Sequence, residues 1–199
     1  MEQTFNKNKY AGFIKVVQVI VKVVMIFLYV ILGFVALGFV ASLIIPNQFL
    51  EFDLSVFSQY DFQGINIINA IDPTLLERTV NLKRVMIVMF FVASLNLGFA
   101  QFILIHINKL LKNVKEEPFN AQNSIILRNL GIGYVIGGVV ISLFNEFLRV
   151  IVVRTIDIFD TNFDIRLNWQ YIFIGVLILI LGYIFSYGSY LQEEHDQTV

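Results

Sequence analysis

The chain contains no cysteine among its 199 residues, and it has only two histidines, three prolines and one tryptophan. Without cysteine it forms no disulfide and offers no thiolate for catalysis, thiol exchange or metal binding. The two histidines, His106 and His195, stand far apart and lack the spacing of a metal-binding motif. These shortages exclude a thiol oxidoreductase, and we expect neither a metal site nor a cofactor.

Charge is scarce as well. Only 15% of the residues are charged, against about 25% in ordinary soluble domains, while 57% are hydrophobic. The net charge is −1, which argues against direct binding of nucleic acid. A glycine-rich phosphate loop and the GxSxG elbow are both missing. The adjacent pair Glu116 and Glu117 is predicted to lie on a loop, where two neighbouring carboxylates do not converge on one atom. The sequence therefore indicates no catalytic residue, and we expect a protein that is not an enzyme.

Four runs without a charged side chain dominate the sequence, at 23–50, 85–108, 129–145 and 167–192. About 20 mostly apolar residues in a helix cross the hydrocarbon core of a bilayer, which is about 30 Å thick. Helices are expected because unpaired backbone groups cannot face lipid. The sequence predicts an all-α membrane protein with a single domain over residues 1–199. Its four transmembrane helices are predicted near 23–45, 85–107, 130–153 and 170–188.

Lysine and arginine are unevenly distributed over the segments between these helices. Four lie on the N-terminal leader and four on the loop 108–129, against five on the loops 46–84 and 154–169. Because basic residues are enriched on the cytoplasmic side, the leader and loop 108–129 are predicted to lie inside the cell. The apolar run after the leader is too long for a signal peptide. We expect a multi-pass protein of the cell (inner) membrane with both termini cytoplasmic.

The two outer loops carry alternating apolar and polar residues. In 46–84 this alternation predicts two short strands, and in Phe163–Trp169 it predicts a third. Asp72 and Pro73 have the pattern of a helix start, and that helix would continue unbroken into the second transmembrane helix. These features predict a four-transmembrane-helix bundle with a small extracytoplasmic β-containing cap. An irregular loop resting on the membrane surface is the alternative.

The third predicted helix contains an intramembrane polar group formed by Asn145, Glu146 and Arg149. Glu146 and Arg149 are three residues apart on one helix face, close enough to pair. A charged residue inside a membrane helix suggests an ion path, a ligand contact or a switch. The alternative is a self-neutralising pair, with Arg149 extending toward the outer interface.

Small residues recur at a spacing of four in two predicted helices, as Gly133 with Gly137 and as Ser94 with Gly98. Such pairs allow helix backbones to approach closely in lipid. We expect them to pack within the bundle rather than to form a dimer. Asn96 and Gln101 on the second predicted helix are expected to hydrogen-bond across the bundle.

Two segments resemble a known family. "EEPFNAQNSIILRNLG" resembles the Pro-Phe … Asn … Leu-Arg-x-x-Gly signature of the bacterial domain-of-unknown-function family numbered 2975, and "YGSYLQEEHDQTV" resembles its terminal pattern. The matching positions are Pro118, Phe119, Asn123, Leu127, Arg128 and Gly131, then Gly188, Leu191, Glu194, Asp196, Thr198 and Val199. Gln197 departs from the family's usual leucine. The four-helix layout agrees with the family as well.

The resemblance implies a role beside small helix-turn-helix regulators, which members of the family often accompany. On this hypothesis the chain is a membrane sensor, or a protein that sequesters a cytosolic transcriptional regulator. Pro118 is expected to end the second transmembrane helix, and Asn120 or Asn123 to cap the third. Arg128 is expected to contact the acidic C-terminal tail. The alternative function is a small transporter, pore or lipid-binding protein that uses the polar group on the third helix.

Overall fold

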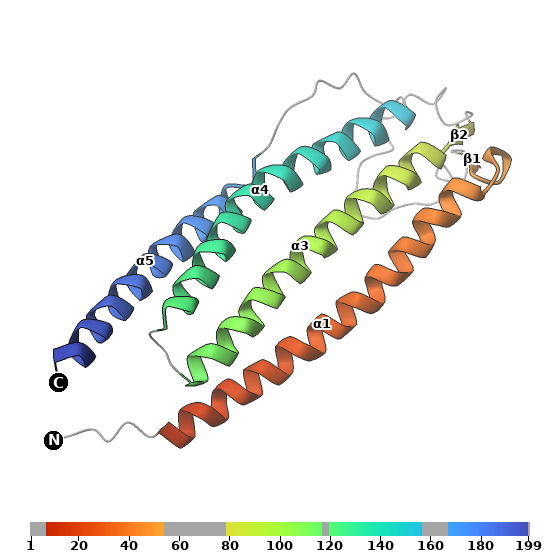
Figure 1. The fold of residues 1–199 in the computed structure, drawn as a ribbon. Helices are drawn as coiled ribbons and strands as arrows, with labels where there is room; N and C mark the ends of the chain where they lie inside the picture. The colour runs from red at the N-terminus through yellow and green to blue at the C-terminus, as the bar shows by residue number, and fades with distance from the viewer. Residues whose placement is uncertain (1–6, 54–78, 117–119, 157–166, 199) are drawn as a thin grey trace, which may run out of the picture. The chain divides into compact units, whose positions relative to one another are not determined.

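The computed structural model describes residues 7–53, 79–116, 120–156 and 167–198 (Figure 1). Four long helices make up most of this part: α1 (Lys7–Ile44), α3 (Lys83–Glu116), α4 (Ala121–Ile156) and α5 (Trp169–Thr198). A short 3-10 helix, η1 (Asn47–Phe49), and two strands, β1 (Glu51–Asp53) and β2 (Thr79–Asn81), lie between α1 and α3 in the chain.

Each of the four helices is long and apolar enough to cross a membrane. The candidate spans are Gly12–Ile44, Lys83–Lys115, Ala121–Thr155 and Trp169–His195. The prediction of four transmembrane helices is therefore confirmed. The helices exceed the predicted spans: α5, with 30 residues, is the shortest of them, yet at about 1.5 Å per residue it is about 45 Å long. A hydrocarbon core of about 30 Å accommodates only part of that length.

Large apolar side chains on the outside of the helices are consistent with a lipid environment. Phe34 and Leu37 on α1 are 70% and 68% exposed, and Phe173 on α5 is 65% exposed. Soluble monomers rarely expose contiguous apolar surface on this scale, because the hydrophobic effect favours its removal from water. A bilayer supplies the apolar surroundings that these side chains require.

The helix termini follow local rules of capping. The side chain of Asn120 accepts a 2.8 Å hydrogen bond from the backbone N–H of Gln122, which makes Asn120 the N-cap of α4. Of the two asparagines that the sequence offered for this role, Asn120 is the one that fills it. Asn123 lies inside the first turn of α4 and is fully buried. Pro118 lies outside the described residues, but α3 ends just before it, at Glu116.

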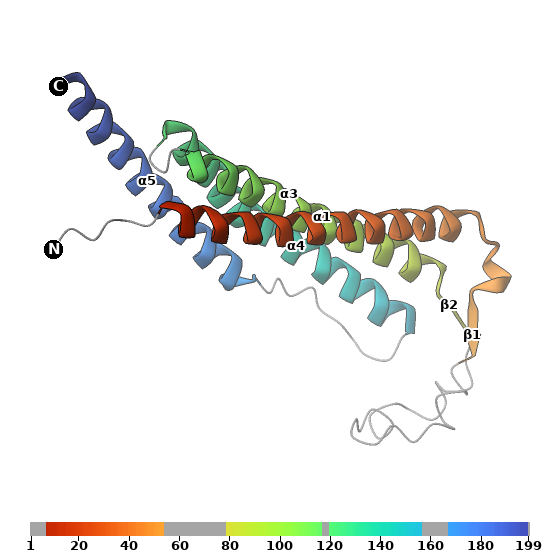
Figure 2. The same cartoon turned by 90° about the horizontal axis from the view of Figure 1, so that it is seen from below.

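The start of α3 corrects one prediction. Residues 79–81 do not belong to a helix that continues into the second transmembrane helix; they form β2, and α3 begins at Lys83 (Figure 2). β2 pairs antiparallel with β1, with Phe52 opposite Val80. The backbone N–H of Leu82 then donates to the carbonyl of Leu50. This non-local pairing replaces the helical hydrogen bonds that residues 79–81 would otherwise form.

A three-stranded cap is not supported by the described residues. β1 and β2 form a two-stranded ribbon, and three strands are usually needed for independent stability. The predicted third strand fell on 163–169. Of these residues, 163–166 lie outside the described part, while Trp169 begins α5.

The chain divides into two compact units, described separately below. Unit 1 comprises residues 1–32, 96–140 and 167–199, and unit 2 comprises residues 33–95 and 141–166. Buried apolar side chains of unit 1 include Ile14, Val21, Ile126, Leu127 and Leu130. Those of unit 2 include Val80, Val92, Ile141 and Val150.

Candidate functional site

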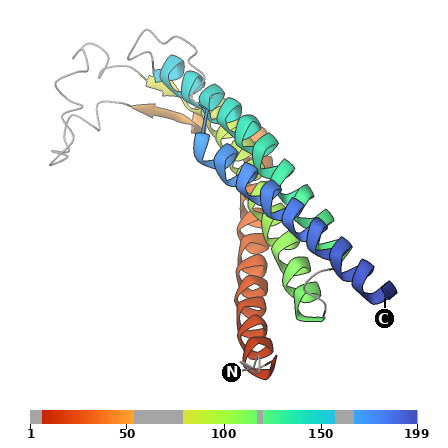
Figure 3. The ribbon, with the colours of Figure 1, turned by 90° about the vertical axis from the view of Figure 1, so that its left-hand side faces the viewer.

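In unit 1, α4 and α5 lie side by side and antiparallel (Figure 3), and glycines line their contact. A Cβ atom added at Gly131 would lie 2.9 Å from the carbonyl oxygen of Gly175, and one added at Gly175 would lie 2.9 Å from that of Gly131. A Cβ at Gly138 would lie 2.6 Å from Cβ of Tyr171. Only glycine allows the two backbones to approach this closely.

The Gly133 and Gly137 pair packs on a different helix. A Cβ atom at Gly133 would overlap the ring of Phe102, and one at Gly137 would overlap the ring of Phe99. Both rings come from α3, so the pair packs within the protein, as expected. The ring of Phe99 also makes an edge contact with Tyr134, with centroids 5.7 Å apart. Gly133 and Gly137 therefore accommodate aromatic rings rather than a neighbouring backbone.

The second small-residue pair does not behave as expected. The Ser94 hydroxyl donates to the carbonyl of Phe90 in its own helix, at 2.8 Å. A Cβ atom added at Gly98 would meet no other atom of the described residues within 4 Å. Gly98 thus lies on an exposed face of α3, and spacing alone gave a wrong prediction of close packing there.

Gln101 forms the polar contact expected across the bundle. Its side-chain amide donates a 2.8 Å hydrogen bond to the backbone carbonyl of Met25, joining α3 to α1 within unit 1. Gln101 is buried. A side-chain donor of this kind stabilises helix association in lipid, where hydrophobic burial gives little driving force.

The predicted inner motif lies on α4 and α5, where the structure separates its members. Arg128 is exposed and borders a cavity of about 380 Å³ between the two helices, together with Ser124, Ile125, Leu179, Gly182, Tyr183 and Ser186. Gly182 contacts this part of α4, since its added Cβ would lie 3.3 Å from the backbone nitrogen of Arg128. Gly131, also in the motif, forms the glycine contact described above. Phe119 lies outside the described residues.

The second half of the motif occupies the last turns of α5. Gly188, Leu191 and Glu194 lie there, and the side chain of Asp196 is not among those described. Glu194 is twelve residues beyond Gly182, a rise of about 18 Å along the helix. Because Gly182 is the residue beside Arg128, the acidic end of α5 is out of reach. The expected contact between Arg128 and the tail is absent from the described residues.

The intramembrane pair on α4 forms as the sequence predicted. In unit 2, Arg149 donates from Nε to Oε2 of Glu146 at 2.8 Å, and from its terminal nitrogen to Oε1 at 2.5 Å. The Glu146 side chain is only 5% exposed, whereas that of Arg149 is 38% exposed. Asn145 faces outward. The two-point contact neutralises the buried carboxylate within one turn of helix.

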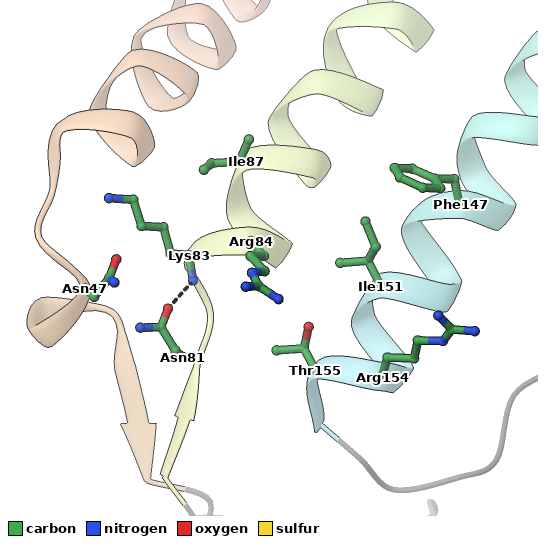
Figure 4. Close-up of a pocket in the computed structure, with 9 residues that line it drawn as sticks. All are labelled: Asn47, Asn81, Lys83, Arg84, Ile87, Phe147, Ile151, Arg154 and Thr155. Atoms are coloured by element: carbon green, nitrogen blue, oxygen red, sulfur yellow. Dashed lines mark hydrogen bonds between the residues drawn. The ribbon is translucent and has the colours of Figure 1, made fainter.

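Sequence reasoning missed a second cavity, of about 790 Å³, in unit 2 (Figure 4). Lys83 and Arg84, at the start of α3, and Arg154, near the end of α4, supply its positive charge. In the sequence these residues were counted only as loop charges that set the topology. The available signal was their position: Lys83 and Arg84 precede one predicted span and Arg154 follows the next. When two consecutive helices pack antiparallel, these two ends meet.

Four helices, each long and apolar enough to cross a membrane, define a multi-pass integral membrane protein. The chain belongs to the family described as "Protein of unknown function (DUF2975)", whose profile matches residues 61–199. The resemblance to this family is thereby confirmed. No curated protein and no solved structure matches the chain.

Proposed function

We propose that this protein is a non-enzymatic membrane sensor that holds a cytosolic partner, a small helix-turn-helix transcriptional regulator, against the exposed C-terminal part of α5. On this proposal both termini are cytoplasmic, and the outer segments receive the signal. The partner's identity rests on the family resemblance, and the surface that would bind it rests on the following observations.

The single observation that carries the proposal is a row of exposed side chains on the last part of α5. Tyr183, Tyr187 and Tyr190 follow one another at spacings of four and three, and Glu194 continues the same row. Tyr183 is 81% exposed. Tyrosine is enriched both in protein interfaces and at the membrane surface, since its ring is apolar and its hydroxyl polar. A row that begins in tyrosine and ends in carboxylate suits a partner with an apolar patch and basic residues.

The length of α5 supports the proposal that the end of this row, at Glu194, lies outside the hydrocarbon core. α5 is 30 residues long, and only about 20 are needed to cross the core. The remaining turns include Glu193 and Glu194, both exposed. DNA-binding regulators carry basic surface for phosphate contacts. The acidic end of α5 therefore has the charge that steers such a protein to the membrane.

Site-specific photo-crosslinking in native membranes tests the proposal. A photoreactive residue replaces Tyr187 in the full-length chain, and the matched control replaces Phe173, which is exposed two heptads earlier on α5. We expect a crosslinked helix-turn-helix protein, identified by mass spectrometry, at position 187 and not at 173. The variant with Glu193→Lys and Glu194→Lys should lose most of this product. Lipid adducts alone at position 187, or the same product at both positions, would contradict the proposal.

The orientation is tested separately, with the cysteine-free chain as background. Single cysteines replace Gln192, near the end of α5, or Asn47, in η1; both positions are exposed. A membrane-impermeant maleimide applied to intact cells should label the cysteine at 47 and leave that at 192 unlabelled until the membrane is opened. The reverse pattern would place the α5 end outside and would exclude a cytosolic partner.

A second candidate function is a small carrier, pore or lipid-binding protein that uses Asn145, Glu146 and Arg149. The observation in its favour is a carboxylate buried in a helix long enough to span the membrane. Purified protein in liposomes, with and without Glu146→Gln, provides the test. Ion or solute flux that depends on Glu146 would support this function, and flux equal in both proteins would remove it.

A further inference from the structure

The cavity in unit 2 changes from apolar to cationic along both of its helices. On α3, Arg84 precedes Ile87 by one turn, and on α4, Phe147 and Ile151 precede Arg154 by successive turns. In Figure 4, Ile87 and Phe147 lie at one end of the cavity and Arg154 at the other, with Arg84 at the level of Ile151. A ligand that matches this order has an anionic head and an apolar body.

Local backbone contacts fix the cationic end. The backbone N–H of Lys83 donates to the Asn81 side chain at 3.0 Å, and that of Met86 donates to the carbonyl of Leu82 at 2.9 Å, so α3 begins at this point. The Lys83 ammonium donates to the carbonyl of Ile45 at 2.9 Å, just beyond the end of α1. Lys83 is thus engaged in holding α1, which leaves the two arginines as the cations for a ligand.

Neither arginine is neutralised by the described residues. Within ranges 7–53, 79–116, 120–156 and 167–198, neither Arg84 nor Arg154 forms an ion pair. The first turn of α3 contains no acidic residue, although the helix dipole favours negative charge there and disfavours a cation. An anion beside Arg84 would remove this conflict, because it would meet both the guanidinium and the positive end of α3.

Figure 4 shows the two arginines in different positions. Arg84 lies at the first turn of α3, at the level of Ile151 on α4, whereas the guanidinium of Arg154 is directed away from α3. Both arginine side chains are exposed, and Arg84, the one nearer the apolar lining, is the main cation for a ligand. The apolar part of the cavity comes from Ile87, Phe147 and Ile151.

We propose that this cavity binds an anionic phospholipid, with the phosphate on Arg84 and the upper part of an acyl chain along Phe147 and Ile151. Arginine suits this role because its planar fork donates two parallel hydrogen bonds to phosphate oxygens. A volume of about 790 Å³ is within the range of small-molecule sites, about 300–1,000 Å³. The lipid is favoured over free phosphate because one wall of the cavity is apolar.

Native mass spectrometry of the full-length, delipidated protein in detergent tests the proposal with three probes. Short-chain phosphatidylglycerol carries the anionic head and the chains, glycerol phosphate carries the head alone, and short-chain phosphatidylcholine carries a zwitterionic head. We expect phosphatidylglycerol to bind more tightly than either of the others. Equal binding of glycerol phosphate would show a soluble-phosphate site, and equal binding of phosphatidylcholine would show no charge selectivity; each overturns the proposal.

Substitutions localise the binding. Arg84→Gln should weaken phosphatidylglycerol binding by about 10-fold to 100-fold, the effect of losing hydrogen bonds to a charged group. Arg154→Gln should weaken it less, and Arg128→Gln, an exposed arginine in unit 1, serves as the matched control and should leave it unchanged. Phe147→Ala removes a side chain that is already half exposed, so it tests the acyl contact without opening the core. Unchanged binding in Arg84→Gln would refute the assignment.

Discussion

Replacing Gly131 by alanine should destabilise the contact between α4 and α5. The new Cβ would lie 2.9 Å from the carbonyl oxygen of Gly175, about 0.5 Å closer than an ordinary contact of 3.4 Å or more. It would also lie 2.7 Å from Cγ of Leu179, a side chain that can move. The carbonyl oxygen cannot move alone because it belongs to the backbone of α5. Relief of the clash therefore requires the two helices to separate.

The expected loss follows from the size of that separation. The full attraction between two atoms in contact is about 0.1–0.2 kcal/mol per pair, and a gap of about 0.5 Å removes about a quarter of it. With about 40 atom pairs along the contact, as many as one buried leucine makes, the loss is about 1–2 kcal/mol. Measured costs of overpacking, about 1–3 kcal/mol, include this value.

The assay is reversible unfolding of the purified protein in mixed micelles of increasing SDS content. Gly98→Ala is the matched control, since its added Cβ would meet no atom of the described residues within 4 Å; its free energy of unfolding should not fall and should rise by up to about 1 kcal/mol, the gain in helix propensity. A Gly131→Ala variant that is as stable as the parent, or more stable, would refute the reasoning. Alanine is the better helix former, so a gain is the outcome that helix propensity alone would give.

The separation itself is measurable by crosslinking. A Cβ at position 182 would lie 3.3 Å from Cβ of Leu127, near the range of about 3.5–4.5 Å in disulfides. Leu127→Cys with Gly182→Cys should therefore form a disulfide on mild oxidation, and no other cysteine competes because the chain has none. Adding Gly131→Ala should slow this oxidation. An unchanged rate would mean that the helices had not moved apart.

Three further changes should have measurable effects in the same SDS titration. Glu146→Gln removes the carboxylate that pairs with Arg149 and should lower the free energy of unfolding by about 1–2 kcal/mol. This is less than the ~3–5 kcal/mol of a fully buried pair, because the Arg149 side chain is 38% exposed. Adding Arg149→Gln should recover much of the loss, and strictly additive costs would refute the coupling. Gln101→Leu deletes the hydrogen bond to Met25 and should cost about 0.6 kcal/mol, the average for such bonds in a membrane protein; no loss would show that this bond contributes nothing. Asn120→Ala removes the N-cap of α4 and should cost about 1 kcal/mol, whereas Asn120→Asp should retain stability.

The helices were predictable because lipid simplifies the problem. A long run without charge has one common solution in a bilayer, a helix that satisfies its own backbone hydrogen bonds. The Glu146–Arg149 pair was predictable for a related reason: both residues are on one helix, and their spacing alone brings them together. The N-cap of α4 was likewise a matter of residue type next to a helix start.

Features that depend on contacts between residues far apart in the sequence were harder to predict. The sequence predicts residues 79–81 inside a helix that starts at Asp72 and Pro73, yet they pair with residues 51–53, 26 to 30 positions earlier in the sequence. The local sequence pattern of residues 79–81 does not indicate which segment they pair with. The cationic cavity has the same origin, since Arg84 and Arg154 come from different helices. The absent contact between Arg128 and the tail was a misjudgement of register: Gly182, rather than the acidic end, lies beside Arg128.

The glycines of α4 show why spacing must be interpreted together with the partner helix. Gly133 and Gly137, four residues apart, accommodate rings of α3, whereas Gly131 and Gly138, seven residues apart, face α5. On α5 the matching glycines, Gly175 and Gly182, are also seven apart. A spacing of seven returns to the same face after two turns; Gly131 meets Gly175 there, whereas Gly138 meets Tyr171 and Gly182 meets Leu127 and Arg128. On α4 the spacing of four therefore marks positions for rings of α3, and the spacing of seven marks the face that packs on α5.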